Sequence, residues 1–346
     1  MCNIAGYVGN RPAAPILIDM IRSQEGFNAG FYTGIATMHQ GKIYYAKLTG
    51  DTDRLVSLTD AAKLPGTVGI IHSRTRSGGG DGWAHPFVGY KNGEVDCAYV
   101  ANGAAGFFKN LVPKAAEIAA ELERSGYPMN CKLEGEKRAS YPILPDGRSV
   151  HMSDVMCQLF QKNNDESGDA VQAISKAYCE MPGEIVGILL TLSEPDAIVW
   201  SRITKPMFVG FSDHGACLSS CAIAFPEGFG EPQLLPVCSS GRVYADHFTS
   251  HPYAKPPAKV AELDASIRCK AYNEIYKGLC ESEKTFNDLL KTIRSIWKTD
   301  ADCLPDAPLV YDVLYSIYKK GELKMKTINV DGVTPGLKAP QTSFYV

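Results

Sequence analysis

Apolar segments of strand length, separated by polar turns, fill the first third of the chain. Residues 3–8, 66–74 and 95–103 are such segments, and the last two each end in a polar cluster. Residues 33–48 contain two more, joined at Gln40-Gly41, which predicts a β-hairpin. This part of the chain is therefore expected to build antiparallel sheet.

Helical patterns follow in separate blocks. Residues 16–21 form a short apolar pattern behind two prolines, and residues 113–126 begin with Pro and end with Gly around an interior of Ala, Glu, Leu and Arg. A polar insertion precedes another helical pattern at 153–162, and residues 184–225 return to strands. Because strands and helices come in blocks with hairpin-length connections, the chain is predicted to be α+β, with antiparallel sheets rather than a doubly wound parallel sheet.

Composition changes near residue 252, where a proline-rich segment leads into a second region. Three helical patterns are expected there, and the tail at 332–346 is predicted to be a loop. We place the first domain at 1–252 and assign 253–346 to a small, mostly helical region of unknown role. The three helical patterns cover 257–281, 283–298 and 309–320.

Length and charge narrow the classes of function. The chain has 346 residues, more than a single core usually holds, and a net charge of -3, which gives no case for nucleic acid or an anionic membrane. No apolar run approaches a transmembrane helix, and no signal peptide is expected. The 11 cysteines are an odd number and scattered, which favours free thiols in the reducing cytoplasm over disulfides or a metal site.

Cys2 directly follows the initiator methionine. If Met1 is removed, one residue carries both a thiol nucleophile and a free α-amine. An ordinary thiol has a pKa near ~8.5 and an ordinary α-amine near ~7.7–8.0, so such an amine is able to exchange a proton with the thiol without a histidine. The alternative is a small residue behind Met1 with no role.

Five motifs occur in order within residues 2–155, and the strand segment "SRITKPMFVGF" (201–211) continues the pattern to roughly residue 240. The five motifs are "CNIAGYVG" (2–9), "GIIHSRTRSGG" (69–79), "AHP" (84–86), "ANG" (101–103) and "SDV" (153–155). Together they resemble the class II glutamine amidotransferases, a group of N-terminal nucleophile hydrolases, and especially the glutaminase domain of glucosamine-6-phosphate synthase. The resemblance implies a four-layer αββα sandwich of two mainly antiparallel sheets between helices, with the small helical region added at the C-terminus.

The resemblance also implies roles for catalytic residues. Cys2 is the expected nucleophile. Asn102 and Gly103 are expected to stabilise the oxyanion, through a side-chain amide and a backbone N–H. Asn-Gly is also a favoured turn dipeptide, and both interpretations of this pair remain open.

Substrate recognition is expected from three further residues. Arg74 is the candidate clamp for the α-carboxylate, because guanidinium pairs bidentately with carboxylate, and Ser77 adds a hydroxyl. Asp154 is the candidate partner of the α-ammonium, with a helix-capping role as the alternative. Arg76 is expected to be a solvated surface residue. Thr75 stands where synthase members carry Trp, which leaves coupling through an ammonia channel open.

Three functional hypotheses follow. The first is hydrolysis of L-glutamine to glutamate and ammonia through a γ-glutamyl thioester on Cys2, either alone or for an ammonia-accepting enzyme. The second is an N-terminal cysteine amidase with a different amide substrate, and the third an inactive scaffold that binds a partner. None of the three requires a cofactor or a metal, and a homo-oligomer is possible in each.

Overall fold

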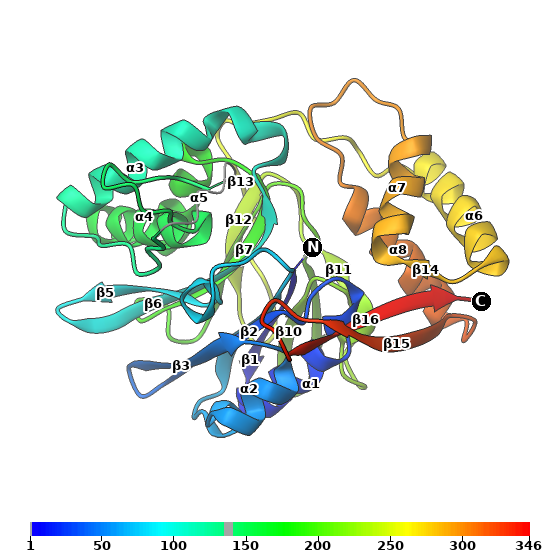
Figure 1. Ribbon diagram of the computed structural model, residues 1–346, viewed down its shortest axis with the longest axis horizontal. Helices are drawn as coiled ribbons and strands as arrows, with labels where there is room; N and C mark the ends of the chain where they lie inside the picture. The colour runs from blue at the N-terminus through cyan, green and yellow to red at the C-terminus, as the bar shows by residue number, and fades with distance from the viewer. Residues whose placement is uncertain (1, 135–140) are drawn as a thin grey trace.

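The computed structural model describes residues 2–134 and 141–346, in which two antiparallel sheets stack face to face (Figure 1). The first sheet has seven strands in the order β11-β9-β10-β1-β4-β2-β3. Its strands are β1 (Asn3–Gly9), β2 (Tyr32–His39), β3 (Lys42–Thr49), β4 (Val68–Arg74), β9 (Phe208–Ser212), β10 (Gly215–Ser219) and β11 (Gln233–Leu234).

Strand β1 lies inside this sheet, between β10 and β4. Residues 3–8 are all buried, which explains their continuous apolar character. At Gly6 the second sheet comes so close that a Cβ would lie 3.0 Å from Ile198 and 3.1 Å from Ile188. The strand that carries Cys2 is thus held on both edges and on both faces.

The second sheet has six strands in the order β13-β12-β8-β7-β6-β5. These are β5 (Phe87–Lys91), β6 (Glu94–Ala104), β7 (Glu184–Thr191), β8 (Ile198–Arg202), β12 (Ser239–Val243) and β13 (His251–Pro252). Aliphatic side chains of both sheets form one core between them. That core includes Ile4, Val8, Ile70, Val100, Ile188, Ile198, Trp200 and Leu218.

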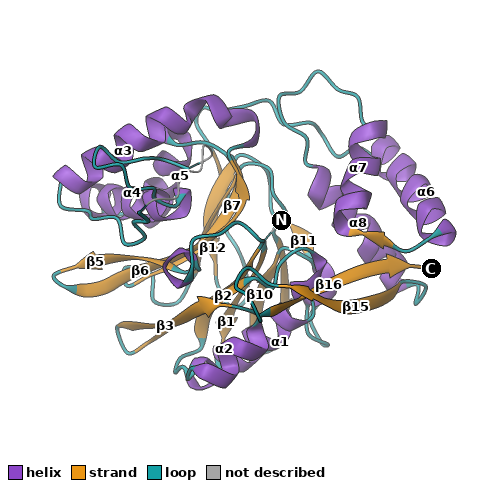
Figure 2. Cartoon of the chain, viewed as in Figure 1, coloured by secondary structure: helices purple, strands orange, loops and turns teal. Residues whose placement is uncertain are grey.

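Helices cover the outer faces of both sheets (Figure 2). Helices α1 and α2 pack on the first sheet, whereas α3, α4 and α5 form the layer over the second. The predicted four-layer αββα arrangement of an α+β fold is therefore confirmed. The bounds are α1 (Ala13–Arg22), α2 (Thr52–Leu58), α3 (Val112–Arg124), α4 (Met152–Ser167) and α5 (Ala170–Glu180).

The C-terminal region contains the three predicted helices and a three-stranded sheet in the order β14-β16-β15. The prediction of a loop-like tail was wrong, because residues 338–345 pair with β15 along their whole length. Gly332, Pro335 and Gly336 suggested a loop, and they lie before the strand rather than in it. The elements are α6 (Ala265–Glu281), α7 (Phe286–Ile296), α8 (Asp306–Lys319), β14 (Lys284–Thr285), β15 (Lys324–Asp331) and β16 (Lys338–Tyr345).

This region packs against the end of the first sheet. Tyr311 of α8 is fully buried with Phe27 and Phe344, and its hydroxyl accepts a hydrogen bond of 3.3 Å from Asn3 Nδ2. The residue that follows the candidate nucleophile is therefore in contact with the C-terminal region. The boundary at residue 252 stays a prediction. Among the helices of the described ranges, none is long and apolar enough to span a bilayer.

Candidate active site

Cys2 lies where strand ends of the two sheets meet. Its backbone N–H donates a hydrogen bond of 3.0 Å to Oδ1 of Asn102, which comes from β6 of the second sheet. Its Sγ lies 4.0 Å from Oγ1 of Thr75, which directly follows β4 of the first sheet. Asn102 is fully buried, so its amide group is held beside Cys2.

Gly103 occupies a position that no other residue suits. Its φ is +140°, and a Cβ there would collide with the carbonyl oxygen of Glu184 on β7. Asn102 and Gly103 lie inside strand β6, so the turn interpretation of the Asn-Gly pair is wrong for this chain. Because Gly103 has no side chain, none of its own atoms covers its backbone N–H, and Gly103 lines the same cavity as Cys2.

A cavity of about 510 Å³ opens at Cys2. Arg74, Ser77 and Gly103 line it together with Cys2, so the fold brings four of the six predicted site residues to one space. Its other walls are formed by Thr75, His85, Tyr99, Ala101, Ala104, Ala105, Gly106, Lys109, Tyr141, His151, Met152, Ser153, Met156, Met181, Pro182, Gly183 and Ile185.

Arg74 is buried in the wall of this cavity, with 2% of its surface exposed. Its Nη1 donates to the carbonyl oxygens of Gly78 at 2.9 Å and Trp83 at 3.1 Å, and its Nη2 donates to the hydroxyl of Tyr141 at 3.3 Å. The guanidinium stacks on Tyr32 at 4.7 Å. It takes part in no salt bridge recorded for the described part of the chain, so it presents an unneutralised cation to the cavity.

Ser77 and Arg76 differ in exposure, as predicted. Ser77 is half-buried at the cavity wall and donates a hydrogen bond of 3.1 Å to the carbonyl oxygen of Thr75. Arg76 is exposed. The hydroxyl of Ser77 thus lies at the same wall as Arg74, whereas Arg76 faces solvent.

Asp154 differs from Arg74 and Ser77 because it is buried away from the described lining of the cavity. It is fully buried, and its carboxylate accepts hydrogen bonds from the backbone N–H groups of Asn130 at 2.6 Å and Cys131 at 3.0 Å and from Nε2 of Gln158 at 3.1 Å. It is absent from the described residues that line the cavity. Burial raises the pKa of this carboxyl, and the hydrogen bonds oppose that shift. These contacts tie the first turn of α4 to residues 130–131.

Sequence comparison finds curated proteins that are similar to this chain. The glutamine–fructose-6-phosphate aminotransferase (isomerizing) of Pyrococcus horikoshii is 25% identical over 271 residues, which cover 76% of this chain and 40% of the relative. That of Symbiobacterium thermophilum is 28% identical over 224 residues, which cover 64% of this chain and 31% of the relative. The chain is thus similar in sequence to glutamine–fructose-6-phosphate aminotransferases over about two thirds to three quarters of its length.

Solved structures share the fold of this chain. The glutamine phosphoribosylpyrophosphate amidotransferase of B. subtilis, in complex with ADP and GMP, matches with a TM-score of 0.58 and 15% identity over 84% of this chain and 55% of that one. An allosteric regulatory enzyme of purine biosynthesis matches with a TM-score of 0.57. No family model matches the chain. The chain spans about 40% of the length of the first curated relative.

Three buried histidines form a cluster beside Cys2, and two of them, His85 and His151, line the Cys2 cavity; the sequence analysis gave none of the three a role. The ring of His85 stacks on His72 at 3.8 Å and meets His151 edge-on at 5.3 Å. Burial lowers the pKa of His72 to about 3 and holds those of His85 and His151 well below the usual value, so all three are neutral. The available signals were His72 in "GIIHSRTRSGG", His85 in "AHP" and His151 two residues before "SDV".

The three histidines make different contacts. His72 Nε2 bonds to the carbonyl oxygen of Ala101 at 3.0 Å, and His151 Nδ1 caps α4 by accepting from the N–H of Ser153 at 3.1 Å. His85 lines the cavity, and neither of its ring nitrogens has a hydrogen-bond partner in the part of the chain that the structure describes. A neutral imidazole here is able to contact a substrate without adding charge beside Arg74. No group of three or more potential metal ligands occurs among the described residues.

Proposed function

We propose that this chain hydrolyses L-glutamine to glutamate and ammonia through a γ-glutamyl thioester on Cys2. The observation that carries the proposal is the contact between Cys2 and Asn102, beside Gly103, at one end of a cavity whose wall holds Arg74. The proposed nucleophile thus contacts Asn102 and lies in the same cavity as Gly103 and Arg74, the proposed cation for the substrate carboxylate.

The reaction proceeds in two halves. Sγ of Cys2 attacks the amide carbon, and the oxyanion is met by Nδ2 of Asn102 and the N–H of Gly103. The α-amine of Cys2 accepts the thiol proton and passes it to the departing ammonia. Water then attacks the thioester, and glutamate leaves with regeneration of the thiol.

Removal of Met1 is part of this proposal, because a peptide-bonded nitrogen cannot act as the base. Met1 lies outside the described residues. Asn102 Oδ1 already accepts from the nitrogen of Cys2, and the same contact would orient the freed amine. Asn102 therefore serves both the base and the oxyanion.

Glutamine is proposed to bind with its α-carboxylate at Arg74 and Ser77. The role of Asp154 as the ammonium partner stays a prediction, since its carboxylate is engaged by the backbone at 130–131. The ammonia is supplied to an accepting enzyme or substrate, or released, and the proposed site of action is the cytoplasm. A homo-oligomer also stays a prediction.

A second function is favoured by one observation. The described lining of the cavity includes two cations, Arg74 and Lys109, and neither Asp nor Glu. Such a space suits an amide that carries a carboxylate but no ammonium. Comparing glutamine with glutaric acid monoamide, which lacks only the amino group, separates the two: the glutaminase proposal expects a higher kcat/KM for glutamine, and the amidase alternative expects the reverse.

The direct test of the proposed function is glutamate release by the Cys2→Ala variant. We expect at least about a 10³-fold loss of rate with an unchanged fold, because the nucleophile is gone. Cys269→Ala is the matched control, since Cys269 is a free, exposed cysteine on α6. Full activity in the Cys2→Ala variant would refute the nucleophile assignment.

A further inference from the structure

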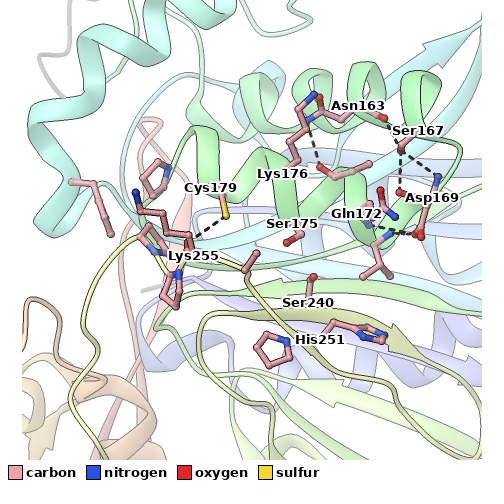
Figure 3. Close-up of a pocket in the computed structure, with 18 of the residues that line it drawn as sticks. Asn163, Ser167, Asp169, Gln172, Ser175, Lys176, Cys179, Ser240, His251 and Lys255 are labelled. Atoms are coloured by element: carbon pink, nitrogen blue, oxygen red, sulfur yellow. Dashed lines mark hydrogen bonds between the residues drawn. The ribbon is translucent and has the colours of Figure 1, made fainter.

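A second and larger groove of about 1,340 Å³ lies against helix α5 (Figure 3). Its walls come from the 3₁₀ helix at Gly106–Leu111, the end of α4, α5, β12 and the segment 251–257. In Figure 3 the α5 side chains Gln172 and Lys176 lie above Ser240 and His251. The groove is not part of the Cys2 cavity described above.

Two buried oxygens in the wall of this groove have no partner. Ser240 is 1% exposed and Asn163 is 2% exposed, and both line the groove. Neither Oγ of Ser240 nor Oδ1 of Asn163 has a hydrogen-bond partner among residues 2–134 and 141–346. A buried polar atom without a partner is unfavourable, so two such atoms in the wall of one groove point to a ligand that completes them.

The charges that line the groove leave two lysines available. Asp169 is paired with Arg242 at 3.1 Å, and Glu166 is paired with Lys176 at 3.4 Å. Lys109 and Lys255 occur in none of the salt bridges of the described residues, although both line the groove. Once these two ion pairs are set aside, Lys109 and Lys255 give the described lining a net positive charge.

The groove meets the Cys2 cavity. Lys109 and Pro182 line both spaces, so the two adjoin at these residues. A ligand that extends along the groove to Lys109 therefore reaches the wall of the cavity in which Cys2 lies.

We propose that this groove is a binding site for a small organic anion that carries hydroxyl groups. Lys109 and Lys255 bind its anionic group, while Ser240 and Asn163 bind its hydroxyls. Ser175 and Gln172 add polar side chains to the same lining. Binding here does not depend on the chemistry at Cys2, so it is tested separately from the proposed function.

Cys179 provides a probe for this site. It lines the groove, is exposed and is not in a disulfide, and it lies beside the backbone carbonyl of Lys255 (Figure 3). Cys269 and Cys280, both exposed on α6, serve as internal controls in the same protein. The experiment measures the alkylation rate of each cysteine by peptide mass spectrometry in the full chain.

Glucose 6-phosphate and gluconate are the anionic probes, and glucose is the neutral control. At ten times its Kd, a bound probe slows alkylation of Cys179 by about tenfold and leaves Cys269 and Cys280 unchanged, because only the free protein reacts there. Lys255→Gln and Ser240→Ala weaken this protection, whereas Lys277→Gln, a change of an exposed lysine on α6, does not.

Two outcomes overturn the proposal: no selective protection of Cys179 by either anion, or equal protection in the Lys255→Gln variant and the unmodified chain. Equal protection by glucose would overturn the anionic class. The Cys2→Ala substitution is expected to abolish glutaminase activity and to leave the alkylation rates of Cys179, Cys269 and Cys280 unchanged. A failure of the anion-site proposal is therefore distinguishable from a failure of the proposed function.

Discussion

The two ends of the Cys2 cavity are built in different ways. At the reaction end, Cys2, Asn102 and Gly103 lie at or beside strands whose positions are fixed by backbone hydrogen bonds. At the recognition end, Arg74 is held by side chains and carbonyls of loops and of the insertion that contains Tyr141. The proposed catalytic geometry thus depends on strand pairing, whereas the proposed recognition depends on how the loop after β4 and Tyr141 hold the Arg74 side chain.

This difference predicts different kinetic effects. Changes at the reaction end are expected to lower kcat, because the groups there act on the transition state. Changes at the recognition end are expected to raise KM or to alter stability. Four substitutions test this division, from the largest expected effect on catalysis to none.

Asn102→Ala has the largest expected effect. Removal of the side-chain donor lowers kcat by about 10²–10³-fold, the usual cost of losing one oxyanion donor. Steady-state glutamate release gives kcat and KM, with Asn329→Ala on exposed β15 as the control. A rise in KM with unchanged kcat would show that Asn102 acts in substrate binding rather than on the transition state, which would contradict the division between the two ends.

Arg74→Lys is expected to act mainly on KM. The variant keeps the charge and loses the planar fork, so KM rises about 10–100-fold, the equivalent of ~1.5–3 kcal/mol of charge-assisted hydrogen bonding. Arg76→Lys, a change of an exposed neighbour, is the control. An unchanged KM for glutamine would contradict the carboxylate clamp.

Asp154→Asn is expected to change stability rather than binding. The carboxylate accepts three hydrogen bonds that anchor residues 130–131 to α4, so weaker acceptance lowers the free energy of unfolding by about 1–3 kcal/mol. Denaturant unfolding and the KM for glutamine are measured together. A large rise in KM with unchanged stability would instead support the ammonium-binding prediction.

Glu25→Gln is expected to leave catalysis unchanged and to alter the pH dependence of stability. Glu25 is buried beneath the recognition end, where it accepts hydrogen bonds from the hydroxyls of Ser73 at 2.8 Å and Thr33 at 3.1 Å. Burial raises its pKa from 4.5 to about 7, against hydrogen bonds from Ser73 and Thr52 that lower it.

The raised pKa of Glu25 makes the stability of the folded chain depend on pH. The folded state holds the proton more tightly than the unfolded state, so the stabilising contribution is complete below pH 4.5 and is lost as the pH rises to about 7. Thermal unfolding from pH 4.5 to 8 is expected to show a smaller fall in Tm for Glu25→Gln than for the unmodified chain. Parallel curves would show that Glu25 does not titrate in this range.

Short motifs in the sequence were enough to predict residues that meet in space. Cys2, Arg74, Ser77 and Gly103 come from three such motifs at or near strand ends, and all four line one cavity, whereas their roles stay predictions. The environment of Asp154 and the cluster of His85 and His151 depend on side chains brought together from distant segments, and no local pattern encodes them. Strand β16 was missed for a related reason, since its partner β15 and the apolar cluster around Phe344 are tertiary features.

Intact mass spectrometry tests the central claim most directly. The purified chain is treated with an electrophilic glutamine analogue that carries a diazoketone in place of the amide, and the adduct is then mapped by peptide analysis. The account predicts a chain that lacks Met1 and carries a single adduct on Cys2, and no adduct in the Cys2→Ala variant. A chain that retains Met1 and gains no adduct, or an adduct on another cysteine, would contradict it.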